Sequence, residues 1–135
     1  MAENIRKMTC LTATVEDRPG ALAELAKGLA DANVNLVGMW GYPISGGRAV
    51  VMCIPDEPGK VKSLAASAGM EIEESTVFVI EGDDRVGALV DPVQKIAGAG
   101  INLYAASALA TGSQFAAAIW VNSEDVDKVA GLLGV

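Results

Sequence analysis

Residues 17–22 are DRPGAL, and residues 84–89 are DRVGAL. The two copies start 84 − 17 = 67 residues apart. The same offset, without a gap, matches Asn35-Leu36 to Asn102-Leu103, Ala49 to Ala116, Glu57 to Glu124 and Ile5 to Ile72. Similarity at a fixed period is typical of repeated structural units. The sequence therefore predicts two copies of one fold unit.

Each copy has the order strand, helix, strand, strand, helix, strand. In the first copy, strands are predicted at residues 8–16, 34–42, 48–54 and 70–81, with a hairpin turn at 45–47. Leu22, Leu25 and Leu29 form an apolar stripe, which predicts a helix with Pro19 in its first turn. A second helix is predicted between a capping Asp56 and Gly69.

This order is the split βαβ pattern. It predicts an α+β fold of two ferredoxin-like βαββαβ units, at residues 1–74 and 75–135, each an antiparallel sheet with its helices on one face. The second copy reaches Val135 before a fourth strand. We therefore expect residues 3–7 to supply that edge, so that the two units are intertwined.

Strand alternation predicts the two faces of the segment that begins at Val34. Val34 and Leu36 should face the helices, and Asn35, Val37 and Met39 should lie on the opposite face. An apolar sheet face without a helix is costly in water, so we expect this face to meet the other half or a second chain.

Composition excludes several classes of function. The net charge of −7 repels phosphate backbones, and an aromatic content of 4% leaves few stacking platforms for bases. The chain has no histidine, which removes the commonest proton shuttle and metal ligand. We expect no nucleic acid, membrane, metal or cofactor, no catalytic residue, and a cytoplasmic location.

The two segments DRPGALAELAKGLADANVNL and DRVGALVDPVQKIAGAGINL resemble the ACT domain, a regulatory module of many enzymes of amino-acid metabolism. The resemblance covers nearly the whole chain and is similar to stand-alone tandem ACT proteins. It implies a ferredoxin-like fold, effector binding between paired units and frequent oligomerisation. Carried over by position, it implies ligand contacts at Asp17, Arg18, Pro19, Gly20, Ala21 and Asn35, and at Asp84, Arg85, Gly87, Ala88 and Asn102.

Elementary chemistry supports an amino-acid ligand at these loops. A helix start offers unpaired N–H groups to a carboxylate, and Gly20 allows close approach. Asp17 could take the ammonium group, and Asn35 could orient the ligand. The alternative is structural: both aspartates could be helix caps, and the asparagines could satisfy backbone groups. Because Val86 replaces the motif proline and Pro92 interrupts the second helix, we expect the first loop to bind more strongly.

Three functions remain open. The leading one is a regulatory protein that binds an amino acid or similar metabolite and changes its association with itself, as a homodimer, or with a partner enzyme. The second is a small ferredoxin-like enzyme that uses Asp17 or Asp84 as a base. The third is an assembly partner of a metabolic enzyme that binds no ligand.

Overall fold

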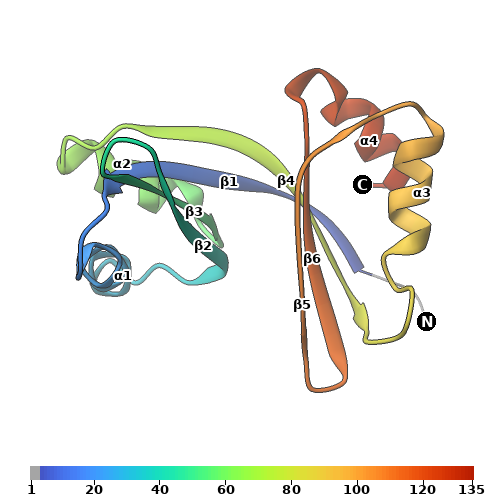
Figure 1. Cartoon of the computed structure of the whole chain (residues 1–135), viewed down its shortest axis with the longest axis horizontal. Coiled ribbons are helices and arrows are strands. Elements are labelled where there is room, and N and C mark those ends of the chain that lie inside the picture. Colours follow the sequence, from blue (N-terminus) through green and yellow to red (C-terminus); the bar gives the residue numbers. More distant parts are fainter. Residues whose placement is uncertain (1–3) are drawn as a thin grey trace. The chain divides into compact units, whose positions relative to one another are not determined.

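The computed structural model describes residues 4–135 as six strands, four α-helices and a short 3₁₀ helix (Figure 1). The strands are β1 (Asn4–Glu16), β2 (Leu36–Ile44), β3 (Arg48–Pro55), β4 (Ile72–Asp83), β5 (Leu103–Thr111) and β6 (Gln114–Val121). The helices are α1 (Ala21–Asp31), α2 (Pro58–Ser67), α3 (Val90–Gly98), η1 (Ser123–Asp125) and α4 (Val126–Leu133). Contacts divide the chain into two compact units.

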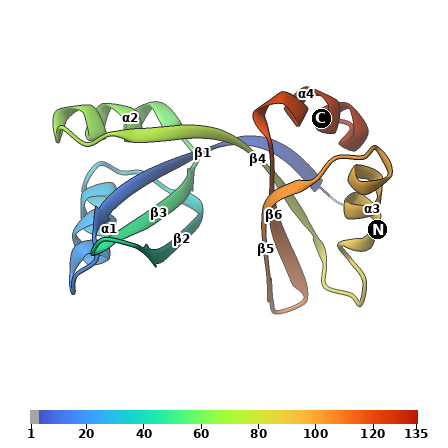
Figure 2. The same cartoon turned by 45° about the horizontal axis from the view of Figure 1, so that its top comes forward.

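One unit comprises Thr9–Ser75. Its strands lie in the order β2-β3-β1-β4, which is the ferredoxin-like order, and α1 and α2 are its helices (Figure 2). Its small buried cluster combines Leu11 and Cys53 from the sheet with Leu29 of α1 and Val61 of α2. Both helices therefore face the same side of the sheet, and the predicted α+β class is confirmed.

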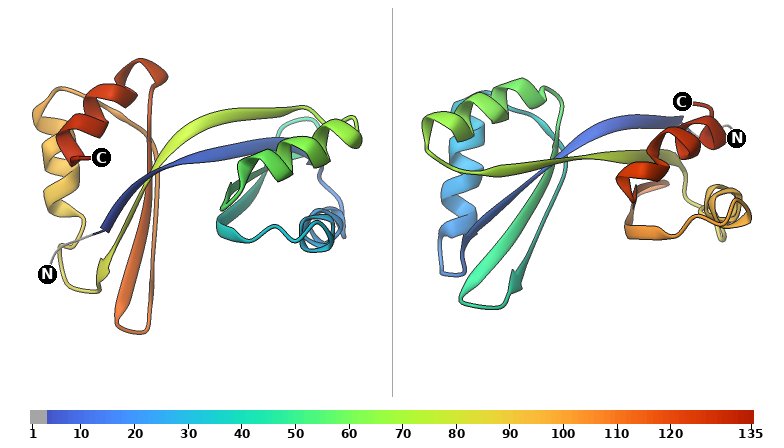
Figure 3. Two further views of the ribbon diagram at one scale, coloured as in Figure 1. Left: turned by 180° about the vertical axis from the view of Figure 1, so that it is seen from behind. Right: turned by 90° about the horizontal axis from the view of Figure 1, so that it is seen from above.

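The other unit comprises Thr76–Val135 together with residues up to Met8. Its strand order is β1-β4-β6-β5, the same order by position in the repeat, and α3 and α4 lie on one face of the sheet (Figure 3). The side chains of Asn4 and Arg6 both reach Glu81 on β4, with Arg6 Nη2 2.5 Å from Glu81 Oε1. Residue 3 of the predicted edge segment lies outside the described residues.

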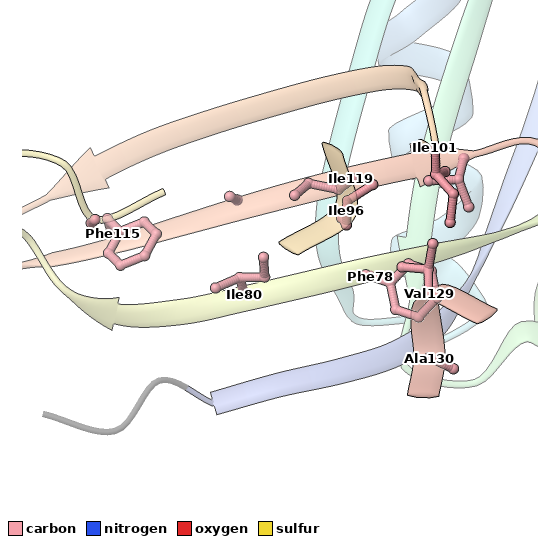
Figure 4. Close-up of a cluster of buried hydrophobic side chains, with 11 residues drawn as sticks. Phe78, Ile80, Ile96, Ile101, Phe115, Ile119, Val129 and Ala130 are labelled. Atoms are coloured by element: carbon pink, nitrogen blue, oxygen red, sulfur yellow. The ribbon is translucent and has the colours of Figure 1, made fainter. Parts of the chain in front are cut away.

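The core of this second unit is larger than that of the first. It contains eleven buried residues, including Phe78 and Ile80 of β4, Ile96 of α3 and Val129 of α4 (Figure 4). Ile5 of β1 is partly buried against the same cluster. The cluster therefore joins residues from both ends of the chain.

The prediction that the repeat keeps an offset of 67 residues without a gap is wrong after the hairpin turn of each copy. Glu16 pairs with Arg48, and its counterpart Asp83 pairs with Gln114, so the offset there is 114 − 48 = 66 residues. Residues 45–47 join β2 to β3, whereas only residues 112–113 join β5 to β6. One residue fewer in the second turn shifts everything that follows. The matches of Ala49 to Ala116 and Glu57 to Glu124 are therefore not structural equivalences.

The predicted placement of Met39 on the helix-free face is also wrong. The pairing between β2 and β3 shifts between Leu36 and Gly38, so Val37 is an extra residue. A bulge of this kind breaks strict alternation. Met39 then pairs with the helix-facing Cys53. The second copy has its shift at the same place in the repeat, between Leu103 and Ala105.

Two helix starts differ in detail from the sequence prediction. Pro19 precedes the first helix instead of entering it, because α1 begins at Ala21. The second helix has Glu57 at its N-cap, without a side-chain cap bond, and Pro58 at its first position, so Asp56 is not the cap. Proline suits the first helical position because the N–H that it lacks would have no intrahelical acceptor there.

Replacement of Gly38 tests the packing of the helix-free face of β2. An added Cβ at Gly38 would lie 2.6 Å from Cη2 of Trp40, so we expect Gly38→Ala to push the indole away. Because Trp40 is half-buried and the close atom is the far end of its indole, the ring can move off its rotamer at a cost of about 0.5–1.5 kcal/mol. Urea unfolding followed by tryptophan fluorescence measures the loss.

Gly41→Ala is the matched control, since its Cβ would meet nothing closer than the Val50 carbonyl oxygen at 3.7 Å. Equal unfolding midpoints for the two variants would contradict the close Gly38–Trp40 contact.

Candidate functional site

The first motif loop is a tight turn tied to the neighbouring hairpin. The Asp17 N–H donates to the Gly47 carbonyl at 2.9 Å, and the Ala21 N–H donates to the Arg18 carbonyl at 3.2 Å. Gly20, with φ 88° and ψ −12°, occupies the position of a type II turn that needs a positive φ. Helix α1 begins directly after this turn and leaves its first N–H groups without helical acceptors.

The second motif loop has the same turn. The Asp84 N–H donates to the Ser113 carbonyl at 2.9 Å, the Ala88 N–H donates to the Arg85 carbonyl at 3.2 Å, and Gly87 has φ 78°. Because valine also fits the second position of this turn, the loss of the motif proline does not change it. Neither motif aspartate is a helix cap, because neither helix has a side-chain cap bond.

The helix that follows the second loop starts later. Helix α3 begins at Val90, three residues after Gly87, and Pro92 lies in its first turn. The N–H groups of a first turn have no intrahelical acceptor, so Pro92 removes no helical hydrogen bond there. The kink expected from a proline inside the helix is therefore absent from α3. Its N-terminus, however, presents one N–H fewer than that of α1.

Each motif loop borders a hollow formed with the end of the adjacent hairpin. The first hollow has a volume of about 190 Å³ and is lined by Asp17, Arg18 and Ala21 together with Tyr42 of β2. The second hollow has a volume of about 340 Å³. Its lining includes Asp84, Arg85, Gly87, Ala88 and Leu109. Leu109 occupies the repeat position of Tyr42, so the two hollows are equivalent sites in the two units.

The charges around the two loops differ. Arg18 Nη2 lies 2.6 Å from Glu24 Oε2, and Arg18 Nε lies 3.1 Å from Glu16 Oε2. The hydrogen bond and charge of Arg18 lower the pKa of Glu24, and the same bond with Glu24 raises the pKa of Arg18. The equivalents of the two glutamates are the shorter Asp83 and Asp91. Within residues 4–135, Arg85 accordingly makes no ion pair.

The two predicted asparagines lie away from the loops of their own units. Ile44, at the end of β2, and Glu16, next to Asp17, both pair with Arg48 on β3. Leu36, at the start of β2, pairs with Pro55 at the other end of β3. Asn35, nine residues before Ile44, is therefore at the far end of β2 from Asp17, about 30 Å along the strand at 3.3 Å per residue. The same pairing pattern separates Asn102 from Asp84.

Of the remaining predicted residues, Pro19 and Gly20 shape the first turn without lining the hollow. The hairpin residues Tyr42 and Leu109 were not predicted. The signal that could have found them was strand direction, since β1 and β2 run parallel with β3 between them, which brings the end of β2 beside the motif loop.

Residues 4–135 contain neither a candidate metal-binding cluster nor a membrane-spanning helix. No group of three or more histidine, cysteine, aspartate or glutamate side chains is placed to hold a metal ion within that range. No helix in the described part of the chain has both the length and the apolar character needed to cross a membrane.

Residues 11–65 match the family model of the ACT domain. Among solved structures, the chain is similar to protein BT0572 from Bacteroides thetaiotaomicron, with 18% identity and a TM-score of 0.83 over 96% of this chain and 88% of that one. It is also similar to the ligand-free regulatory subunit of aspartate kinase from Thermus thermophilus, with 13% identity and a TM-score of 0.62 over 98% and 93%. At such identities these likenesses show the fold. No curated protein matches the chain.

Proposed function

We propose that this chain, whose residues 11–65 match the family model of the ACT domain, is a regulatory protein that binds a small metabolite, an amino acid, at its motif loops. The binding of this ligand changes how the chain associates with a second copy or with a partner enzyme. The observation that carries the proposal is the presence of equivalent hollows beside both motif loops.

The size and chemistry of the first hollow suit a small zwitterion. Its volume of about 190 Å³ is below the roughly 300–1,000 Å³ of drug-sized pockets. The N–H groups of Leu22 and Ala23, at the start of α1, can donate to a carboxylate. Asp17, whose carboxylate makes no ion pair among residues 4–135, can accept from an ammonium group.

The first loop is proposed as the stronger site. Helix α1 follows its turn directly, and Leu22 in its first turn, whose N–H has no helical acceptor, lines the hollow. In the second loop α3 starts three residues after Gly87, and Pro92 has no N–H to offer. Regularly spaced donors at a helix start attract an anion more strongly than scattered ones.

Ligand-dependent association is proposed at the outer strands. Tyr42 and Leu109 line the two hollows and are 51% and 75% exposed, and they belong to β2 and β5, the strands at the two edges of the sheet order. A chain that docks against either edge would therefore touch a ligand in the hollow. A ligand favours one state of association only if it binds that state better.

A thermal-shift screen of the twenty amino acids, followed by calorimetry, tests the proposal. An amino acid at 100 times its dissociation constant should add about 2.7 kcal/mol to the free energy of unfolding. Gly20→Ala should weaken binding at least tenfold, because an alanine at a φ of +88° strains the turn that borders the hollow. Gly87→Ala should weaken it less.

Gly69→Ala is the matched control, because Gly69 has a similar positive φ of 66° at the end of α2 and its Cβ would meet nothing within 4 Å. The same backbone strain, about 1–2 kcal/mol, should leave affinity unchanged there. A greater loss from Gly87→Ala would reverse the order of the two sites. If no amino acid raises the melting temperature, the proposed function fails.

A further inference from the structure

The unit Thr9–Ser75 contains a cavity of about 450 Å³ between its two helices and its sheet. The sheet contributes Leu11, Ala13 and Cys53 to the lining. Gly28 of α1 and Ala65 of α2 lie on the helix side. The walls are thus mainly apolar on both sides. We refer to this space as the apolar cavity.

The second unit has larger side chains at three of the lining positions, although Met39 and Val51 of the first unit are larger than their equivalents Ala106 and Ala117. The pairings Leu11–Cys53 and Phe78–Ile119 occupy the same place in the two copies. At equivalent positions, the first unit has Leu11, Ala13 and Cys53 where the second has Phe78, Ile80 and Ile119. Each residue of the first unit is the smaller one. In the second unit these three larger side chains all belong to the buried core (Figure 4).

The electrostatic character of the apolar cavity favours an uncharged occupant. Its charged lining residues are Glu16, Arg18 and Glu24, which pair with one another at the rim. Burial raises the pKa of Cys53 to about 11, so this thiol is neutral near pH 7. A buried water needs two to four polar partners, and the apolar walls do not supply them. A charged ligand group would find no unpaired counter-charge inside.

We propose that the apolar cavity is a binding site for a neutral, apolar small molecule. An engineered apolar cavity of about 150 Å³ in another protein binds benzene, so a space roughly three times larger accepts a medium-length aliphatic chain or a fused aromatic ring. Its volume also falls within the roughly 300–1,000 Å³ of small-molecule sites. This site lies beside the first hollow but is distinct from it, and the inference goes beyond the proposed function.

The probe that tests this site is 1-octanol, with octanoate as its charged counterpart. Calorimetry should give one 1-octanol bound per chain, and NMR should show shifts at Leu29 and Val61, which line the apolar cavity. Ala13→Ile gives the first unit the isoleucine that the second unit has at the equivalent position, Ile80. The larger side chain should occupy part of the cavity and weaken 1-octanol binding at least tenfold. Ala106→Ile, on an exposed position of β5, should leave it unchanged.

Gly28→Leu fills the apolar cavity from the helix side. If Ala13→Ile fails to fold, this variant tests whether 1-octanol binds in the cavity. An added Cβ at Gly28 meets no atom within 4 Å, so α1 can accept the change. Loss of 1-octanol binding in a folded filling variant supports the site. Absence of binding to the unmodified chain, unchanged binding in both filling variants, or equally tight binding of octanoate overturns it. Amino-acid affinity is measured separately, so either proposal can fail alone.

Discussion

Phe78→Ala should lower the free energy of unfolding by about 3–5 kcal/mol, the range for removal of a large aromatic side chain from a packed core. Phe78 is 0% exposed and belongs to the same buried cluster as Ile96 and Val129. The ring therefore has neighbours on the sheet and on both helices of its unit. Truncation removes these contacts and leaves a cavity that the surrounding elements cannot close. Urea unfolding monitored by circular dichroism measures the change.

Leu11→Ala is the matched variant, because Leu11 holds the position of Phe78 in the other unit and is 2% exposed. Its side chain already borders the apolar cavity, so fewer contacts are lost. We expect a cost near the lower end of the range for buried leucine, about 2–3 kcal/mol. If Leu11→Ala destabilised the chain as much as Phe78→Ala does, the first unit would be packed as tightly as the second, contrary to the structure.

The architecture was predictable because local signals and the repeat agree. The motif glycines mark turns that need a positive φ. In the predicted stripe of α1, Leu25 and Leu29 pack against the sheet as expected, whereas Leu22 is exposed. The bulge at Val37 was not predictable, because one extra residue in a strand leaves no trace in an apolar pattern. The shorter hairpin turn of the second copy was hidden by the chance matches of Ala49 and Glu57.

The sequence predicted the loops beside which the two hollows lie, but it did not predict the other residues that line them. Asp17 and Asp84 lie at equivalent hollows, as the repeated motif indicates. The two asparagines were assigned to the same site only because both belong to the repeat. The direction of β2 and β5 places them at the opposite end of these strands from the motif loops. The apolar cavity depends on the summed volumes of side chains from two helices and four strands. A single-sequence pattern gives polarity and period, and it does not give such a volume difference between two copies.

Removal of residues 1–8 should unfold the unit that contains Thr76–Val135 and leave the other unit folded. We propose that residues 4–8 are an essential strand of this unit, since β1 neighbours β4 and Ile5 packs against the core of Phe78. Their loss would uncover that core and leave an edge of β4 without a partner. Burial of one isoleucine is worth about 1.5–3 kcal/mol, before the lost strand hydrogen bonds are added.

Hydrogen exchange read by mass spectrometry distinguishes the two units in one experiment. In the shortened chain, protection should be lost over β6 and retained over β3, because β6 belongs to the unit that loses its edge strand. Arg6→Ala is the control, since it removes only the half-exposed ion pair with Glu81, worth about 0.2–1 kcal/mol, and keeps the strand. Full protection of β6 in the shortened chain would show that the second unit completes its sheet without the N-terminal segment.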